Sequence, residues 1–296
     1  MSNIVITGAS RGIGLATALE LARAGHLVVA TMRNPAGSPE LGDHAAKEKL
    51  PIRIETMDVD SDESVQKAFS RILAQAPVDV LVNNAGIERT GAIEETLLAD
   101  FRACMETNYF GAIRCIQAVV RPMRERGSGA IINVTSVAGK ISLSPMAPYS
   151  ASKFALEALS EVLAQELRAF GVRVAIVEPG IIDTRMARNI ESMRDSKVYP
   201  QVRRCAALFQ ATMAAGAGQP QVVAQKVREI VESGTWQLRH PVGPDADPFL
   251  AWRESMNDEI WVQWSAQSDS EWSKSVKADF GMDLKLAQPG RRPADM

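Results

Sequence analysis

Cysteine is scarce in this sequence. The 296 residues include only three, Cys104, Cys115 and Cys205, and none of them forms a CxxC pair. An odd and sparse set of cysteines in a chain of this size is typical of a reducing compartment. We therefore expect a cytoplasmic protein.

Long apolar runs are also missing. No uninterrupted apolar stretch reaches the roughly 18 residues that a membrane span requires. The opening residues, MSNIVITG, enter a strand-like run directly, with no basic segment followed by a long apolar stretch. We predict no membrane span and no secretory leader.

Charge of one sign is not concentrated anywhere. The formal net charge is -2 and no long single-sign run occurs, which argues against nucleic acid or an anionic membrane as the main partner. The three histidines, His26, His44 and His240, are far apart in the sequence, so we predict packing or surface roles and no metal site. What the chain does have is 46% hydrophobic residues, enough for a substantial core.

Short β-branched runs alternate with longer amphipathic segments. Most of the runs are nearly continuous in Val and Ile, as expected for strands buried on both faces of a parallel sheet. The predicted strands are Asn3–Thr7, Leu27–Thr31, Arg53–Thr56, Val78–Val82, Ile131–Thr135 and Val172–Val177. The predicted helices are Gly12–Ala24, Asp62–Gln75, Leu98–Arg126, Tyr149–Phe170 and Gln221–Glu232, with Asp60 and Glu63 resembling a capping box. This order predicts an α/β fold: a Rossmann-type, doubly wound parallel sheet with helices on both faces.

The composition changes near residue 235, and all five tryptophans lie beyond it. Asp247 and Pro248 resemble an N-cap and first helical residue, and Phe249, Trp252, Met256, Ile260 and Trp264 then recur at helical spacing. A second short helix is predicted to carry Trp272, Val276 and Phe280 and to end at Gly281. The spacing favours simple docking of this segment onto the domain; an apolar lid or a subunit contact is the alternative. Residues Gln288–Met296 are predicted to be disordered.

A glycine-rich turn links the first predicted strand to the first predicted helix. In Thr7–Gly14, Gly8 permits a tight turn, Gly12 lets the backbone approach a pyrophosphate, and Gly14 lets the helix pack close to the strand. The helix N-terminus would then present free N–H groups to phosphates. A glycine triplet by itself is a weak signal, but its position between a strand and a helix favours dinucleotide binding over a purely structural loop.

The second predicted strand indicates which dinucleotide is used. NAD-binding sites have an acidic residue near the end of this strand, and here the strand runs into Met32 and Arg33. Arg33 and Arg11, which lies in the glycine turn, could bind a 2′-phosphate through charge-assisted hydrogen bonds. We predict NADP(H) rather than NAD(H); two merely exposed arginines are the alternative.

Tyr149 and Lys153 are four residues apart at the start of a predicted helix, so they share one face. A nearby ammonium favours a phenolate and is expected to lower the pKa of Tyr149, which suits proton transfer near neutral pH. Ser136 follows a predicted strand and could donate a hydrogen bond to a substrate oxygen. Together these residues predict hydride transfer to a carbonyl, with Tyr149 moving the proton.

In order and spacing, these motifs resemble the short-chain dehydrogenase/reductase family, over about residues 1–240. The similar segments are Thr7–Gly14, Asp58-Val59, Asn83-Asn84-Ala85-Gly86, Asn108, Ser136, Tyr149-x-x-x-Lys153 and Pro179-Gly180. Ala30–Pro35 and Val177–Gly180 resemble, more modestly, the branch of hydroxysteroid and retinol dehydrogenases.

The resemblance implies a role for each matching residue. Asn108 would hold a water that links Lys153 to solvent, and Lys153 would also bond the nicotinamide ribose. The implied catalytic residues are Asn108, Ser136, Tyr149 and Lys153. The implied cofactor-binding residues are Gly8, Ser10, Arg11, Gly12, Ile13, Gly14, Arg33, Asp58, Val59, Asn84, Ala85, Gly86, Tyr149, Lys153, Pro179, Gly180, Ile182 and Thr184.

The chain departs from minimal family members in two segments. We predict a catalytic domain over 1–243, with a long substrate loop over 181–219, and a helical extension over 244–296. The loop contains Met186, Met193, Leu208, Phe209 and Met213, which favours a bulky or apolar substrate. Many relatives use their C-terminal end to build a tetramer, so a homodimer and a homotetramer both stay open.

Two other functions remain as alternatives. A non-catalytic dinucleotide sensor on this fold would not need Ser136, Tyr149 and Lys153 together. A sugar-nucleotide dehydratase or epimerase would usually have a longer substrate domain and a different glycine spacing. We therefore expect an NADP(H)-dependent oxidoreductase acting on a small-molecule carbonyl or alcohol.

Overall fold

Seven parallel strands form the centre of the structure, a computed structural model that describes residues 1–193 and 195–286. Their order across the sheet is β3-β2-β1-β4-β5-β6-β7. The strand numbers fall from β3 to β1 and then rise from β4 to β7, so the order of the strands reverses between β1 and β4. The strands are β1 Asn3–Ile6, β2 Leu27–Met32, β3 Ile52–Thr56, β4 Val80–Asn83, β5 Gly129–Val134, β6 Val172–Pro179 and β7 Arg239–Val242. The predicted doubly wound parallel sheet is confirmed.

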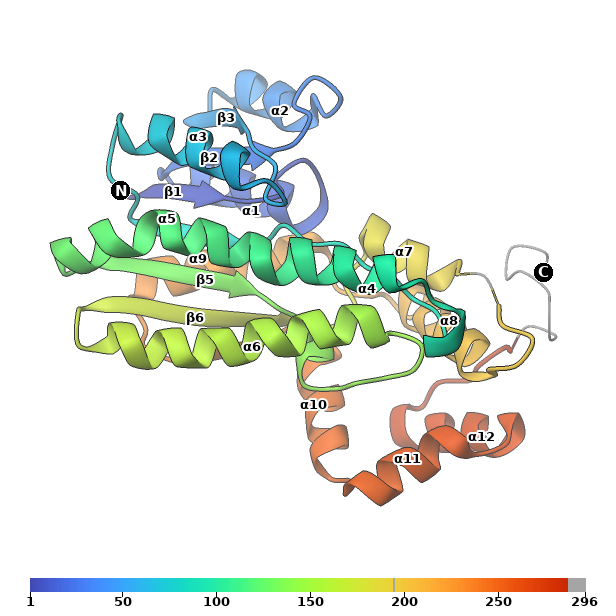
Figure 1. Cartoon of the computed structure of the whole chain (residues 1–296). Helices are drawn as coiled ribbons and strands as arrows, with labels where there is room; N and C mark the ends of the chain where they lie inside the picture. Colours follow the sequence, from blue (N-terminus) through green and yellow to red (C-terminus); the bar gives the residue numbers. More distant parts are fainter. Residues whose placement is uncertain (194, 287–296) are drawn as a thin grey trace.

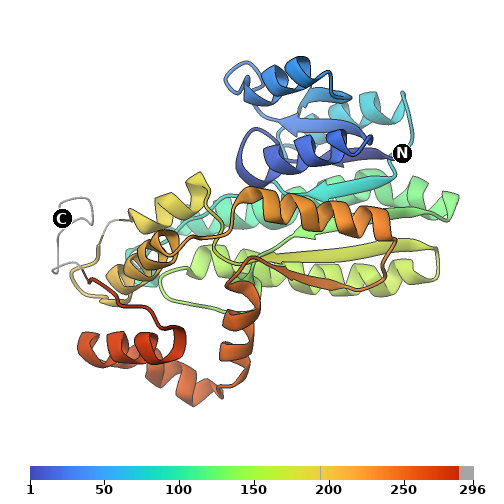
Figure 2. The ribbon, with the colours of Figure 1, turned by 180° about the vertical axis from the view of Figure 1, so that it is seen from behind.

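Helices cover both faces of this sheet. In Figure 1, α5 and α6 lie in front of it; Figure 2 shows α1 and α9 packed together on the opposite face. The helices are α1 Gly12–Arg23, α2 Glu40–Glu48, α3 Asp62–Leu73, α4 Leu98–Met105, α5 Gly111–Arg126, α6 Ala147–Arg168, α7 Arg185–Glu191, α8 Gln201–Ala214, α9 Pro220–Ser233, α10 Ala246–Glu254, α11 Asp258–Ala266 and α12 Asp269–Phe280. None of the helices in the described ranges is long and apolar enough to cross a membrane.

Continuous burial explains the apolar strands. Ile4, Val5 and Ile6 of β1 are each at most 1% exposed, because helices cover both faces of the sheet. The sequence pattern missed β7 and α2. In β7, Arg239 and His240 interrupt the apolar pattern. In α2, Leu41 is the one buried residue among those described, so the helix has no repeating apolar face that the sequence could reveal.

Several predicted boundaries were wrong. The helix predicted over Leu98–Arg126 is broken by a wider π-helical turn, Glu106–Phe110, between α4 and α5. The segment predicted as a loop over 181–219 contains α7 and α8, because Ala187, Ile190, Val202, Cys205 and Phe209 are buried on helical faces.

Two predicted helix caps were also wrong. The N-cap of α3 is Ser61, whose hydroxyl accepts a hydrogen bond from the Ser64 backbone N–H, while the Asp60 carboxylate accepts one from Thr107. Helix α10 begins at Ala246, ahead of the predicted Asp247 cap, and follows Asp245. The Asp245 carboxylate instead accepts a hydrogen bond from the Ile181 backbone N–H at 2.8 Å, which joins the extension to the end of β6.

The C-terminal extension consists of α10, α11 and α12. The apolar spacing from Phe249 to Trp264 suggested one helix, but the chain breaks after α10 and restarts where the Asn257 side chain caps α11. The predicted helix through Trp272 and Phe280, ending at Gly281, is present as α12. In Figure 1 the extension lies below α7 and α8, beyond the carboxyl edge of the sheet. The predicted disorder of Gln288–Met296 concerns residues outside those described.

Buried apolar side chains form separate clusters. Two of them lie between the sheet and the helices on its two faces. A third joins Tyr149 of α6, and Met146 just before that helix, to residues of α7, α8 and all three extension helices. The extension is therefore packed into the part of the core that contains Tyr149.

Candidate active site

The loops that follow β1, β4, β5 and β6 meet at the carboxyl edge of the sheet, around a cavity of about 550 Å³. This is where ligands bind in open α/β sheets, at the point where the strand order reverses. Asn108 lies behind the cavity wall and is buried. All the other residues predicted for the site line the cavity: Gly8, Ser10, Arg11, Gly12, Ile13, Gly14, Arg33, Asp58, Val59, Asn84, Ala85, Gly86, Ser136, Tyr149, Lys153, Pro179, Gly180, Ile182 and Thr184.

The glycine turn after β1 is tied to the loop after β4. The Asn84 side chain donates hydrogen bonds to the carbonyls of Thr7 and Gly8, and the Thr7 hydroxyl accepts from the backbone N–H groups of Asn84 and Ala85. Gly8 has a φ of +68°, and an added Cβ there would lie 2.7 Å from the Ala85 Cα. The turn thus brings two loops together so closely that glycine is required.

Two arginines lie on the cavity wall, one in this turn and one after β2. Arg11 precedes α1 and Arg33 follows β2, and both are exposed. Neither guanidinium forms an ion pair or a hydrogen bond in the part of the chain that the structure describes. Burial raises the pKa of Asp60, and the positive charge of Arg33 opposes that rise. Two cationic groups are therefore available at this end of the cavity.

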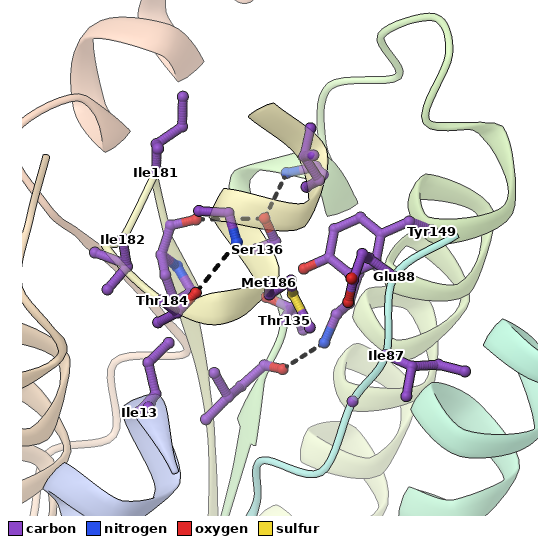
Figure 3. A pocket seen from close by; sticks show the side chains of 18 of the residues that line it. Ile13, Ile87, Glu88, Thr135, Ser136, Tyr149, Ile181, Ile182, Thr184 and Met186 are labelled. Atoms are coloured by element: carbon purple, nitrogen blue, oxygen red, sulfur yellow. Dashed lines mark hydrogen bonds between the residues drawn. The ribbon is translucent and has the colours of Figure 1, made fainter. Parts of the chain in front are cut away.

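Tyr149 and Lys153 lie on the first turns of α6, which begins at Ala147 with a proline in its first turn. The Lys153 ammonium donates a hydrogen bond to the Val134 carbonyl at 2.9 Å and lies 5.6 Å from the centre of the Tyr149 ring. Figure 3 shows Tyr149 and Ser136 facing the same space. The two α6 side chains therefore meet the end of β5 inside the cavity.

Burial governs the protonation of this pair. It raises the pKa of Tyr149 to about 12, against the effect of the Ser136 hydrogen bond, and lowers the pKa of Lys153 to about 8. The predicted lowering of the Tyr149 pKa by Lys153 was therefore wrong for this structure. The physical reason is that burial takes the phenolate out of water, which raises the pKa more than the Ser136 hydrogen bond lowers it.

Ser136 is held by the backbone around it. Its side-chain oxygen accepts a hydrogen bond from the Ala138 N–H at 3.1 Å, and its hydroxyl lies 3.4 Å from the Pro179 carbonyl. These contacts place the hydroxyl between the end of β5 and the end of β6, on the same side as Tyr149.

Asn108 lies in the π-helical turn, a feature that often marks functional positions. Its side-chain amide pairs with both backbone groups of Ile87 and donates to the Ser152 hydroxyl at 2.8 Å. An added Cβ at Gly86 would lie 3.3 Å from Asn108 Oδ1 and 3.7 Å from Lys153 Nζ. Asn108 therefore braces the loop after β4 against α6, close to the lysine.

Other cavity residues were not foreseen as site residues. Ile87 and Glu88 directly follow the predicted Asn84–Gly86, so their position in the chain was a usable signal. The Glu88 carboxylate accepts a hydrogen bond from Asn189 at 2.7 Å, which ties α7 to the cavity beside Tyr149. Aromatic residues of the extension also line the cavity, so docking and contact with the site are both observed.

Two buried carboxylates lie behind the site, around Arg239. Glu178 of β6 is 1% exposed, with its Oε1 atom 3.6 Å from the Arg239 Nε atom, which also donates a hydrogen bond to Glu157. Burial, reinforced by the charge of Glu157, raises the pKa of Glu178 to about 7, while Arg239 opposes the rise.

We expect this carboxyl to destabilise the protein as the pH rises. Below about pH 4.5, Glu178 is protonated in both states; between there and pH 7 the unfolded chain releases its proton first, so folding loses up to about 3 kcal/mol. Glu178→Gln should remove this loss. Urea unfolding of both proteins at pH 5 and pH 8 checks the prediction, and an equal pH dependence in the two would contradict it.

An edge of this kind can hold a dinucleotide and transfer a proton beside it, which defines an NAD(P)-dependent dehydrogenase or reductase. A family model described as short chain dehydrogenase matches residues 2–195, and the chain belongs to that family. Human retinol dehydrogenase 8 is 42% identical over 202 residues, which are 67% of this chain and 64% of that protein.

Solved structures give the same result. A short-chain dehydrogenase from Streptomyces avermitilis has a TM-score of 0.75 and 31% identity, and covers 94% of this chain and 98% of its own. A gluconate 5-dehydrogenase from Burkholderia cenocepacia, in complex with NADP and tartrate, has a TM-score of 0.71 and 27% identity, covering 83% of this chain and 95% of its own. The predicted family and enzyme class are confirmed.

Proposed function

We propose that this enzyme uses NADP(H) to transfer a hydride between the nicotinamide and a carbonyl or secondary alcohol of a bulky or apolar substrate. One observation carries the proposal: the Ser136, Tyr149 and Lys153 set and the two free arginines line a single cavity. The set lies beside the apolar lining, whereas Arg11 lies in the glycine turn and Arg33 follows β2. This arrangement suits a nicotinamide at one end and a 2′-phosphate at the other.

The residues of the cavity divide the chemistry between them. The bound cofactor supplies the hydride for reduction. Tyr149, with a pKa of about 12, is protonated at neutral pH and can donate its proton to the substrate oxygen, which Ser136 polarises. Lys153 donates a hydrogen bond to the Val134 carbonyl and would also donate one to the nicotinamide ribose. The same steps in reverse oxidise an alcohol.

Two further predictions belong to this proposal. Asn108 would support a water chain from Lys153 to solvent, which is consistent with its place behind Gly86. We also divide the chain at residue 243, because β7 ends at Val242 and α10 starts at Ala246.

The cellular setting and assembly are also predictions. All three cysteines are free and buried, which suits the predicted reducing, cytoplasmic compartment. A homodimer or homotetramer remains a prediction. The dinucleotide sensor gains no support, since the similar proteins named above are dehydrogenases.

Loss of NADPH absorbance tests the reaction class. Purified enzyme should consume NADPH with apolar ketones or aldehydes, faster than with small polar ones. A preference for NADH in kcat/KM, or no turnover of any carbonyl compound, would overturn the corresponding part of the proposal.

Arg33→Ala should weaken the use of NADPH selectively. A charge-assisted bond to a phosphate is worth about 1.5–3 kcal/mol, so kcat/KM for NADPH should fall roughly ten- to a hundredfold. The kcat/KM for NADH should change little, because NADH lacks the 2′-phosphate. Steady-state kinetics with both cofactors measure this.

Arg121→Ala provides the matched control. Arg121 is an exposed arginine of α5 that pairs with Glu125 and does not line the cavity. Its removal should leave both cofactors unaffected. An equal fall in kcat/KM for NADPH and for NADH in Arg33→Ala would mean that Arg33 does not bind the 2′-phosphate.

A further inference from the structure

Five aromatic side chains of the extension line the active-site cavity, and we refer to them as the aromatic wall. They are Phe249 and Trp252 from α10, Trp261 and Trp264 from α11, and Phe280 at the end of α12. Phe249, Trp261 and Trp264 are less than a tenth exposed, while Trp252 and Phe280 are half-buried. Three helices outside the sheet thus contribute to one surface of the site.

The rings of the wall support one another. The Trp252 ring makes edge-to-face contacts with Trp261, Trp264 and Phe280, at centroid distances of 5.3, 4.9 and 4.9 Å. Trp261 and Trp264 stack with their planes 5° apart, and Phe249 meets Phe280 at 5.1 Å. Because each ring is held by its neighbours, the wall is preorganised before a ligand arrives.

Polar contacts fix the wall to the helix that covers the site. The Trp252 indole N–H donates to the Asp279 carboxylate at 3.1 Å, which links α10 to α12. On α8, the buried Arg204 donates to Asp269 at 2.7 Å and to the Gln267 carbonyl at 2.8 Å. The extension and α8 are therefore joined, so the wall keeps its place relative to the cavity.

The lining on this side of the cavity is almost entirely apolar. Among the described lining residues that come from α7, α8 and α10–α12, Arg185 is the one charged residue and Asn189 the one uncharged polar residue. Both lie on α7; the lining residues of α8, Leu208 and Phe209, are apolar, as is most of the wall. Apart from the Arg185 guanidinium and the Asn189 amide, this side offers a charged or strongly hydrated group nothing to replace the water that it would lose.

The wall belongs to the same apolar cluster as the catalytic tyrosine. Tyr149, Met146 and Ile141 pack in one cluster with Leu208, Phe209 and the extension aromatics. A substrate whose oxygen lies at Tyr149 and Ser136 can therefore extend over apolar surface without leaving the cavity. Aromatic faces add ring-to-ring attraction to the area that they bury.

We infer that the aromatic wall binds the non-reacting body of the substrate, and that this body is a large apolar ring system. The inference rests on the proposed function, since it takes the reacting carbonyl to lie at Tyr149. It assigns substrate selection to the extension, with Trp252 at the centre of the ring contacts.

A pair of methyl ketones tests the assignment, one with a naphthyl group on its chain and one short and unbranched, butanone. The readout is the ratio of kcat/KM for the naphthyl ketone to kcat/KM for butanone, with NADPH. Trp252→Ala should lower this ratio by about tenfold or more, because truncation removes ring contacts that only the larger ketone makes. Isothermal titration calorimetry of the naphthyl ketone should show a similar loss of affinity.

Val262→Ala is the matched control, since Val262 is a 66% exposed residue of α11 outside the cavity lining. It should leave the ratio unchanged. Should Trp252→Ala not fold, as thermal unfolding would reveal, Phe249→Leu keeps most of the apolar volume and should still lower the ratio.

The outcomes separate the two proposals. An unchanged ratio and unchanged affinity in a folded wall variant would overturn the aromatic wall as the substrate-binding surface. Binding of the naphthyl ketone that depends on Trp252, without turnover of any carbonyl compound, would support the wall and overturn the proposed function.

Discussion

Tyr149→Phe is expected to abolish turnover while leaving cofactor binding largely intact. The change removes only the phenolic oxygen, which the structure places toward Ser136 within the cavity. Loss of a positioned general acid costs roughly a hundredfold to ten-thousandfold in rate. Steady-state kcat with an apolar ketone measures the loss, and NADPH fluorescence titration measures cofactor affinity.

Tyr199→Phe is the control for this change. The Tyr199 hydroxyl donates to Glu94 at 2.7 Å, and the residue does not line the cavity. Its turnover should match that of the unaltered enzyme. A Tyr149→Phe enzyme that kept near-normal kcat would rule out Tyr149 as the proton donor.

Gly14→Ala is the second change with a large expected effect. An added Cβ at Gly14 would lie 2.4 Å from the Gly8 carbonyl oxygen and 2.5 Å from Asn84 Nδ2. These atoms belong to the bonded contact between two loops, so relief requires the start of α1 to move. We expect a loss of about 2 kcal/mol in the free energy of unfolding, as for other overpacked sites, and at least about tenfold weaker NADPH binding.

Gly42→Ala offers a matched helical glycine. An added Cβ there would lie 3.6 Å from the Ile54 Cδ1 atom, an ordinary contact, and α2 lies away from the cavity. Because alanine favours helix over glycine, this variant should gain about 0.5–1 kcal/mol and bind NADPH normally. Urea unfolding and fluorescence titration compare the two variants; equal behaviour would remove the argument for a tight contact at Gly14.

The fold could be predicted from sequence because its strands are buried on both faces. Such strands read as continuous Val and Ile runs, and their alternation with helices leaves few topologies. The missed elements have weaker patterns: β7 carries Arg239 and His240, and α2 buries Leu41 alone among its described residues. The covering segment over 181–219 was predicted to be a loop because its two helices, α7 and α8, are short and are separated by a non-helical stretch.

The candidate site was predictable to the same degree and for a related reason. Its residues follow strand ends, and parallel strands bring their carboxyl ends to one edge. The position of Glu88 directly after Gly86 was a usable signal, but its contact with Asn189 was not predictable, because the two residues are 101 positions apart in the sequence. Residue spacing within one segment cannot indicate a contact between residues so far apart in the sequence.

The sequence by itself determined the reaction class. Gly8–Gly14, Ser136, Tyr149 and Lys153 are informative because their chemistry follows from residue type, order and spacing, which need no coordinates. Helical spacing also showed that the aromatic residues from Phe249 to Trp264 form apolar faces, but it could not show what those faces meet.

Only the tertiary structure decided the setting of these residues. Burial determines that the pKa of Tyr149 rises and that of Lys153 falls, and burial depends on what the rest of the chain places around them. Packing likewise decides that the extension lines the cavity as well as docking on the domain. Spacing along a helix defines a face, whereas the surface opposite that face is supplied by segments distant in the sequence.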